Sequence, residues 1–186
     1  MIEQHLKTMI EAGVCSPIDH FLASNGVKFE SLEMPSSEIK YLKSIGLCST
    51  RHAPKECYYN SQKFALFDDR LQYCEGVAVG PVPIPLDHAW CVLSTDNGKL
   101  VIDLTWQLKF HARNRWYNNR VLGVIPKGWE YYGIEIDKAE VSKYWRKYEM
   151  SGPILPEILG KRNEKRQYGN NIQEQSKEDS GPRVSL

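Results

Sequence analysis

The sequence lacks the features that mark several special classes of protein. No run approaches the roughly 18–20 consecutive apolar residues of a membrane span. The opening MIEQHLKTMIEAG has no apolar core of the kind found in a signal peptide. The five cysteines include no CxxC pair, which argues against a zinc ribbon, and their odd number argues against a disulfide framework. We therefore expect a cytoplasmic protein with free thiols and no membrane partner.

The sequence also has no large excess of positive or negative charge. Lys and Arg number 24 against 23 Asp and Glu, so the formal charge of +1 creates no overall field to hold nucleic acid or an anionic membrane. Hydrophobic residues make up 41% and charged residues 25%, which excludes fibrous and wholly disordered chains. The length fits one domain over residues 1–160. Residues 161–186 contain almost no large aliphatic residues and are expected to form a disordered tail.

Hydrophobic periodicity changes once along the chain. Helical spacing is found at 2–10, in SSEIKYLKSIGL and at 56–69, and the stretch after the first helix is interrupted by Gly and Pro. The β-rich runs QYCEGVAVG, HAWCVLS and KLVIDLTW follow, separated by turn signals. A strand at 129–136 then precedes a helix in which Val141, Tyr144 and Tyr148 share a face. The sequence predicts an α+β fold with N-terminal helices packed on an antiparallel sheet.

Three residues form a possible catalytic set: Cys57 at the start of a predicted helix, His88 at the start of a strand and Asp103 on the next strand. A free thiol is mostly protonated at neutral pH, but the positive end of a helix and an adjacent imidazole both favour the thiolate. His88 would take the thiol proton and later give it to a leaving group, while Asp103 would orient the imidazole and stabilise its charged form. Such a set carries out acyl transfer.

Strand geometry tests whether the histidine and the aspartate can meet. Alternation places His88 and Trp90 on one face of their strand. If the Asn-Gly pair at 97–98 were the centre of a tight turn, Asp103 would lie about 13 Å from His88 along the strand. A four-residue loop over 95–98 instead places Asp103 opposite Trp90 and diagonal to His88, within reach of an imidazole. The catalytic set therefore predicts the longer loop or a bulge.

The thiols also have an ordinary structural interpretation. Cysteine is among the most buried residue types, and a protein with five thiols usually uses most of them for packing. Cys91 points to the strand face opposite the histidine, Cys74 lies in mid-strand, and Cys15 and Cys48 lie in connecting regions. Cys57 is therefore the thiol with both a helix start and an assigned base.

The run HAWCVLSTDNGKLVIDLTW resembles the transglutaminase-like superfamily of cysteine peptidases and amidases, in which HAW opens one strand and D-x-T, often D-P-T-W, closes the next. QYCEGVAVG is similar to the preceding strand of that superfamily, and ECYYNSQKFAL to its nucleophile helix, so the resemblance covers about residues 56–106. It implies a papain-like core with Cys57 as nucleophile, His88 as base and Asp103 as its orienting carboxylate. Leu104 replaces the usual proline, and tyrosines follow the cysteine where the family is less aromatic.

The resemblance implies thiol-dependent acyl transfer on a peptide, isopeptide or glutamine-like amide, with hydrolysis or deamidation favoured and with no cofactor or metal. Arylamine acetyltransferases share the order of the three residues but are longer chains. The backbone N–H of Cys57 is one expected oxyanion donor, and His52 is the nearest upstream candidate for a second, although a solvated loop histidine is the simpler interpretation. A small catalytic core of this kind fits a bacterial or phage effector.

The segment QLKFHARNRWYNNR, residues 107–120, interleaves basic with aromatic residues. Such mixtures can grip phosphates and stack bases. The neutral overall charge instead favours an amphipathic surface segment that forms one wall of the cleft, so nucleic acid is not the expected partner. The alternative to an enzyme is a non-catalytic module that uses this segment, or a degenerate site, to hold a protein or nucleic acid.

Overall fold

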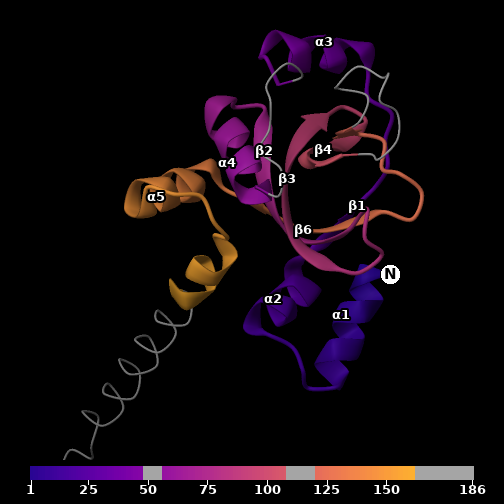
Figure 1. Cartoon of the computed structure of the whole chain (residues 1–186), viewed down its shortest axis with the longest axis vertical. Coiled ribbons are helices and arrows are strands. Elements are labelled where there is room, and N and C mark those ends of the chain that lie inside the picture. The colour runs from indigo at the N-terminus through magenta and orange to yellow at the C-terminus, as the bar shows by residue number, and fades with distance from the viewer. Residues whose placement is uncertain (48–55, 108–119, 162–186) are drawn as a thin grey trace, which may run out of the picture. The chain divides into compact units, whose positions relative to one another are not determined.

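The computed structural model describes residues 1–47, 56–107 and 120–161. The fold is α+β, as the sequence pattern predicts (Figure 1). In chain order the elements are α1 (Ile2–Glu11), α2 (Pro17–Asn25), β1 (Val27–Phe29), α3 (Ser36–Ser44), α4 (Cys57–Phe67), β2 (Leu71–Val79), β3 (Leu86–Thr95), β4 (Gly98–Gln107), β5 (Arg120–Leu122), β6 (Glu130–Ile136) and α5 (Lys138–Tyr148). No helix within these ranges is long and apolar enough to cross a membrane.

The described strands form one antiparallel sheet in the order β1-β6-β2-β3-β4-β5. Strands β2, β3 and β4 are neighbours in both sequence and space, whereas β6 returns to lie beside β2. Strand β1 also contacts β4, although three strands separate them in the sheet order, so the sheet is strongly curled (Figure 1). The curl gives the sheet an inner face on which side chains from distant strands meet.

The inner face holds a hydrophobic core to which every strand of the sheet contributes. Its buried members are Phe29, Cys74, Ala78, Trp90, Val92, Val101, Val121 and Tyr131. Trp90 packs edge-on against Phe29 and Tyr131, with ring centroids 5.5 and 5.2 Å apart. Edge-to-face aromatic pairs add stabilisation beyond their buried area. Because Trp90 lies two residues after His88 on the same strand face, this core anchors the end of β3 that carries His88.

Helix α4 packs on the outer face of β2, β3 and β4 (Figure 1). The thiol of Cys91, which points to this face, donates to the carbonyl of Ser61 over 3.2 Å. The amide of Gln62 donates to the hydroxyl of Tyr73 over 3.1 Å. These buried polar contacts fix the rotation of the helix on the sheet, since a turn about its axis would separate both donors from their acceptors.

The first two helices pack on each other and on β6, so N-terminal helices do cover part of the sheet. Ile2 and Leu6 are the buried residues of α1. The carboxylate of Glu130, on β6, accepts hydrogen bonds from the terminal ammonium group and from the backbone N–H of Ile2. Figure 1 shows α3 at the opposite end of the sheet from this helix pair.

The sequence pattern does not predict α2, β1 or β5. Pro17 reads as an interruption of regular structure, but it is the first residue of α2, where its missing N–H has no partner to lose. Ser16 and Asp19 form a capping box at the same helix end. Strands β1 and β5 have three residues each, which is too short to show an alternating pattern.

The chain divides into two units, Met1–Ile154 and Leu155–Leu186. The first unit contains the sheet and helices α1 to α5. In the second, residues 155–161 are helical. The expected tail over 161–186 lies outside the described residues from position 162 onward.

Candidate active site

The residues expected to act together come from three neighbouring elements. Cys57 is the first residue of α4, and Glu56 occupies the cap position. No acidic residue lies in the first turn of the helix, so the partial positive charge of its N-terminus is not offset within that turn. His88 is the third residue of β3, and Asp103 lies on β4. The Cys57 side chain is half-buried.

The β3–β4 hairpin has the register that the longer loop predicts. Its pairs include Thr95 with Gly98, Ser94 with Lys99, Val92 with Val101 and Cys91 with Ile102. Continued by one residue, this register sets Asp103 opposite Trp90 and diagonal to His88. The register is confirmed, and the turn centred on Asn97 and Gly98 is wrong. The four-residue loop is wrong as well, because Thr95 and Gly98 pair as strand residues and the turn consists of Asp96 and Asn97 alone.

His88 and Asp103 form a buried pair. The Nε2 atom of His88 lies 2.8 Å from Oδ2 of Asp103, and the two residues are 2% and 0% exposed. The other carboxylate oxygen, Oδ1, accepts the backbone N–H groups of Thr105 at 2.8 Å and Trp106 at 3.1 Å. Both oxygens are therefore paired, which holds the carboxylate in one orientation facing the imidazole.

The charges of this pair support each other. Burial by itself lowers the pKa of His88, but the charge of Asp103 and its hydrogen bond outweigh that effect and raise the pKa to about 9. For Asp103, burial favours the neutral acid, yet the imidazolium and the hydrogen bonds lower the pKa below its ordinary value. At neutral pH the pair is therefore an imidazolium and a carboxylate.

Cys57 lies close enough to His88 to contribute to the raised pKa of the imidazole. An imidazole has two ring nitrogens, and Nε2 of His88 faces Asp103. Nδ1 is therefore the ring nitrogen left to face the thiol. The histidine is thus bonded to the carboxylate through one nitrogen and has its other nitrogen for the nearby thiol.

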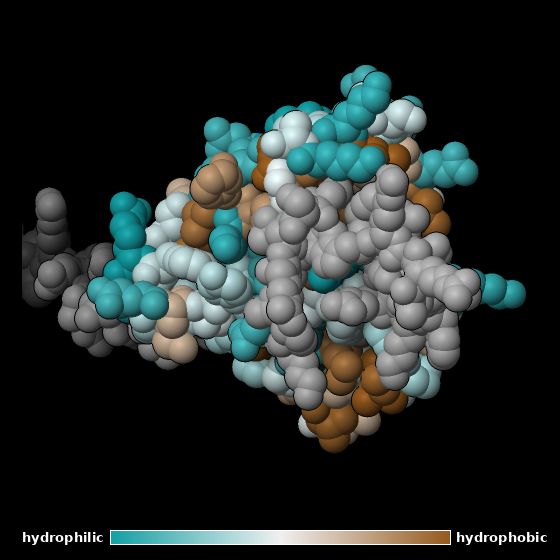
Figure 2. All heavy atoms as spheres, turned by 45° about the horizontal axis from the view of Figure 1, so that its top comes forward, coloured by the Kyte–Doolittle hydropathy of each residue, from teal (hydrophilic) through white to brown (hydrophobic). Residues whose placement is uncertain are grey.

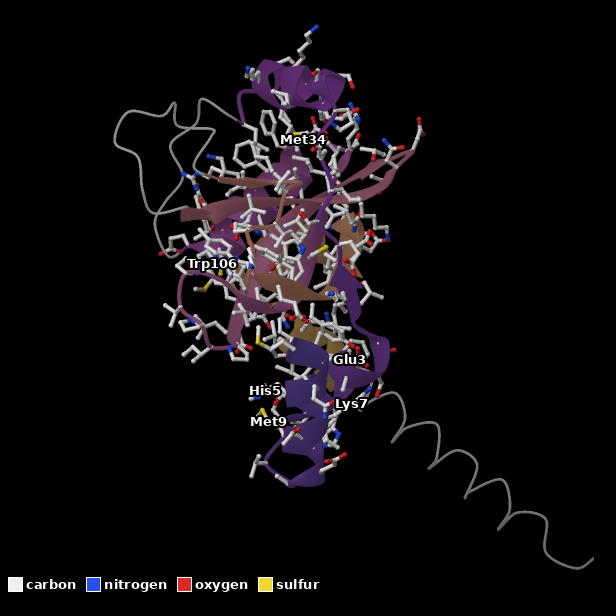
Figure 3. The ribbon with its side chains drawn as sticks, turned by 90° about the vertical axis from the view of Figure 1, so that its right-hand side faces the viewer. Glu3, His5, Lys7, Met9, Met34 and Trp106 are labelled. Atoms are coloured by element: carbon white, nitrogen blue, oxygen red, sulfur yellow. The ribbon has the colours of Figure 1, made fainter. Side chains whose placement is uncertain are left out.

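Trp106 covers one face of the imidazole. The two rings are nearly parallel, at 11°, with centroids 3.9 Å apart. Figure 3 labels Trp106 at one side of the sheet, away from the α1 side chains Glu3, His5, Lys7 and Met9. A Cβ atom at Gly80 would lie 2.3 Å from the indole, so a residue without a side chain is required there. An aromatic face against a protonated imidazole adds a favourable cation–π interaction.

Tyr131 completes the surroundings of the carboxylate. Its hydroxyl donates to Oδ2 of Asp103 over 2.7 Å, and its side chain is fully buried. Sequence reasoning missed this residue because the alternating pattern at 129–136 does not tell which strands become its neighbours. Trp106, by contrast, stands within the D-x-T-W run and was available to sequence reasoning as a site residue.

The other thiols of the described residues lie in different surroundings. Cys91 and Cys74 are fully buried, and burial raises the pKa of both thiols. Cys15 is half-buried near α1, and burial raises its pKa as well. A higher pKa means less thiolate at neutral pH and therefore a less reactive thiol. Cys48 lies outside the described residues.

Several predicted features fall on residues that the structure does not describe. His52, the candidate second oxyanion donor, is one of them, and so are residues 108–119 of the basic and aromatic segment. Its last residue, Arg120, lies on β5 and is 6% exposed. Burial lowers the pKa of this guanidinium, and the charge of Asp103 opposes that effect. Arg120 is therefore part of the interior near the carboxylate and not of an exposed basic surface.

The tyrosines that follow the cysteine separate in the structure. Tyr58 is half-buried, and burial together with nearby Glu75 raises its pKa. Tyr59 is exposed and stacks on Trp145 of α5, with ring centroids 6.1 Å apart. Tyr59 thus joins α4 to α5, which gives it a structural role.

In chemical terms the site brings together a thiol, an imidazole that can carry a proton, and a carboxylate held in one orientation. Within the described ranges there is no group of three or more His, Cys, Asp or Glu side chains placed to hold a metal ion. Comparison with protein-family models, with curated proteins and with solved structures finds no match for this chain. Its function must therefore be inferred from the residues and their geometry.

Proposed function

We propose that the protein is a thiol-dependent acyl-transfer enzyme with a papain-like, transglutaminase-type core, and that its reaction is the hydrolysis or deamidation of an amide. The observation that carries this proposal is the buried His88–Asp103 pair together with the closeness of Cys57, at the start of α4, to the same imidazole. A buried histidine used only for packing needs one partner, whereas acyl transfer needs this order of three groups.

The first half of the reaction forms a thioester. With its proton held on His88, the sulfur of Cys57 attacks the carbonyl carbon of the amide, and a tetrahedral oxyanion forms. The backbone N–H of Cys57, at the free end of α4, is positioned to donate to that oxygen. The carbon–nitrogen bond then breaks, and the imidazolium gives its proton to the departing amine or ammonia.

The second half restores the thiol. A water molecule gives one proton to the neutral imidazole of His88 as its oxygen attacks the thioester carbonyl. The carbon–sulfur bond breaks, the product leaves as a carboxylic acid, and the proton taken from water stays on His88 beside the released Cys57 thiolate. Asp103 keeps its charge throughout and stabilises each imidazolium that forms. A peptide, isopeptide or glutamine side-chain amide satisfies this scheme.

The proposal is tested by trapping the acyl group. The protein is incubated with a cell extract, quenched rapidly with acid, and its peptides are analysed by mass spectrometry. We expect an acyl group on Cys57, and none in Cys57→Ala. Cys15→Ala is the matched control, because Cys15 is the other half-buried thiol of the described residues, and it should retain the adduct.

A second measurement separates an enzyme from a binding module. Iodoacetamide at neutral pH should modify Cys57 well before the other thiols, and His88→Ala should slow that modification. If all five thiols instead react at equal and low rates, the protein is better described as a non-catalytic binding module than as an enzyme.

A further inference from the structure

The connection between β2 and β3 exposes an apolar surface next to His88. Residues 80–86 read GPVPIPL and contain no charged side chain. Val82 is 49% exposed and Ile84 52% exposed, and the neighbouring Pro81 and Pro83 are exposed as well. Figure 2 shows hydrophobic residues gathered at the lower edge of the face that it draws. We refer to residues 81–86 as the proline loop.

Proline and the residues before it hold this loop in shape. Each proline fixes its own φ near −65°, and each residue before a proline is restricted to extended conformations. Pro81, Pro83 and Pro85 alternate with Gly80, Val82 and Ile84, so every position from 80 to 85 is restricted in one of these two ways. The loop therefore loses little further conformational entropy when another chain packs on it.

The loop is joined to the site at both ends. Leu86, His88 and Trp90 share one face of β3, and their exposed fractions fall from 39% to 2% to 0%. His88 thus lies at the boundary between the exposed and the buried part of this face. Leu86 lies about 7 Å from His88 along the strand, on the exposed side. At the other end, Gly80 packs against Trp106, whose ring stacks on His88.

We propose that the proline loop is the wall of the site that binds apolar residues beside the reacting amide, so that the substrate class is peptides or proteins with aliphatic side chains flanking that amide. This proposal rests on the proposed function. The loop carries no charge, and its three prolines have no backbone N–H, so apolar side chains and carbonyl oxygens make up most of the contacts that it offers. A polar or charged segment packed there would lose water and gain few hydrogen-bond donors.

The test uses two pairs of thiol-directed probes. One pair is chloroacetyl-leucyl-valine amide and its neutral polar counterpart, chloroacetyl-seryl-asparagine amide. The other pair carries the same residues on the opposite side of the reactive carbon, as acetyl-valyl-leucyl-glycine and acetyl-asparaginyl-seryl-glycine chloromethyl ketones. Each probe forms a carbon–sulfur bond with Cys57 and releases chloride. Every rate is divided by the rate with iodoacetamide, which corrects for the reactivity of the thiol itself.

In wild type the apolar member of at least one pair should label Cys57 about tenfold faster than its polar counterpart. Ile84→Ser and Val82→Ser should remove most of that preference. Both side chains are about half exposed, so neither change opens the core. Phe67→Ser is the matched control: Phe67 is 83% exposed at the far end of α4, and its replacement should leave the preference unchanged.

Two results would overturn the proposal about the loop: equal rates for the apolar and polar members of both pairs, or a preference that survives both serine variants. These results leave the proposed function intact, because Cys57 still reacts with iodoacetamide. A Cys57 that is inert toward iodoacetamide contradicts the proposed function itself and with it the substrate class.

Discussion

The hydroxyl of Tyr131 and the imidazole of His88 both bond to the same oxygen of Asp103, over 2.7 Å and 2.8 Å. Tyr131 lies on β6 and His88 on β3, with β2 between them in the sheet. Through this shared oxygen, strand β6 is linked by hydrogen bonds to the candidate active site on β3 and β4. Tyr131 is therefore a positioning residue for the carboxylate that orients the histidine.

Tyr131→Phe should lower the free energy of unfolding by about 1–3 kcal/mol, because a buried carboxylate oxygen loses a donor. The labelling rate of Cys57 should fall as well, since the carboxylate is less firmly placed. Urea unfolding and iodoacetamide labelling measure the two effects. Tyr132→Phe is the control, because Tyr132 points to the other face of β6. Equal losses of unfolding free energy and of labelling rate in the two variants would contradict the positioning role of Tyr131.

The stability of the protein should fall in alkaline solution through His88. The pKa of this residue is raised from 6.5 to about 9 in the folded protein, so the folded state binds the proton more tightly than the unfolded chain. The resulting stabilisation is complete below pH 6.5 and is lost as the pH rises through about 9, a change of roughly 3 kcal/mol. Urea unfolding at pH 6 and pH 9.5 measures it.

The variant His88→Gln has no proton to lose in this range, so its stability should change much less between the two pH values. An alkaline loss of equal size in wild type and His88→Gln would assign the effect to other groups.

At acid pH, Asp103 should have the opposite effect on stability. Its lowered pKa gives stabilisation that is present above the ordinary carboxyl pKa and is lost as the pH falls through the folded-state value.

Cys57→Ala and Cys91→Ala should differ in kind. Cys57→Ala should abolish turnover and leave the unfolding transition nearly unchanged, because the thiol is half-buried at a helix end. Cys91→Ala removes a fully buried side chain and its hydrogen bond to Ser61, and should cost about 1–2 kcal/mol with turnover retained. Turnover in the Cys57 variant would show that another residue is the nucleophile.

Gly80→Ala should disturb the histidine through Trp106. The added methyl group would lie 2.3 Å from the indole, so the ring must move off the imidazole. We expect a loss of about 1–3 kcal/mol in stability and a changed tryptophan fluorescence spectrum. Gly160→Ala is the control, because nothing lies within 4 Å of a Cβ at that position. An unaltered spectrum and unaltered Cys57 labelling in Gly80→Ala would contradict the role given to the stacked ring.

Short-range information in the sequence was sufficient for much of the fold. Helical spacing located α1, α3, α4 and α5, and alternation located β2, β3, β4 and β6. Because side chains alternate along a strand, parity alone placed Cys91 on the face opposite His88. The register that sets Asp103 opposite Trp90 was predicted from the requirement that Asp103 reach His88. These relations follow from backbone geometry within a few residues, which the order of residues determines.

Relations between distant segments were decided by the tertiary structure. Strand β6 lies beside β2, 51 to 63 residues away along the register, and this pairing brings Tyr131 to Asp103. Arg120 is buried, although the sequence pattern placed it in a surface segment. The order of residues determined which groups a single hairpin brings together. The packing of the whole sheet decided which further groups surround them, because that depends on contacts with no fixed spacing in the sequence.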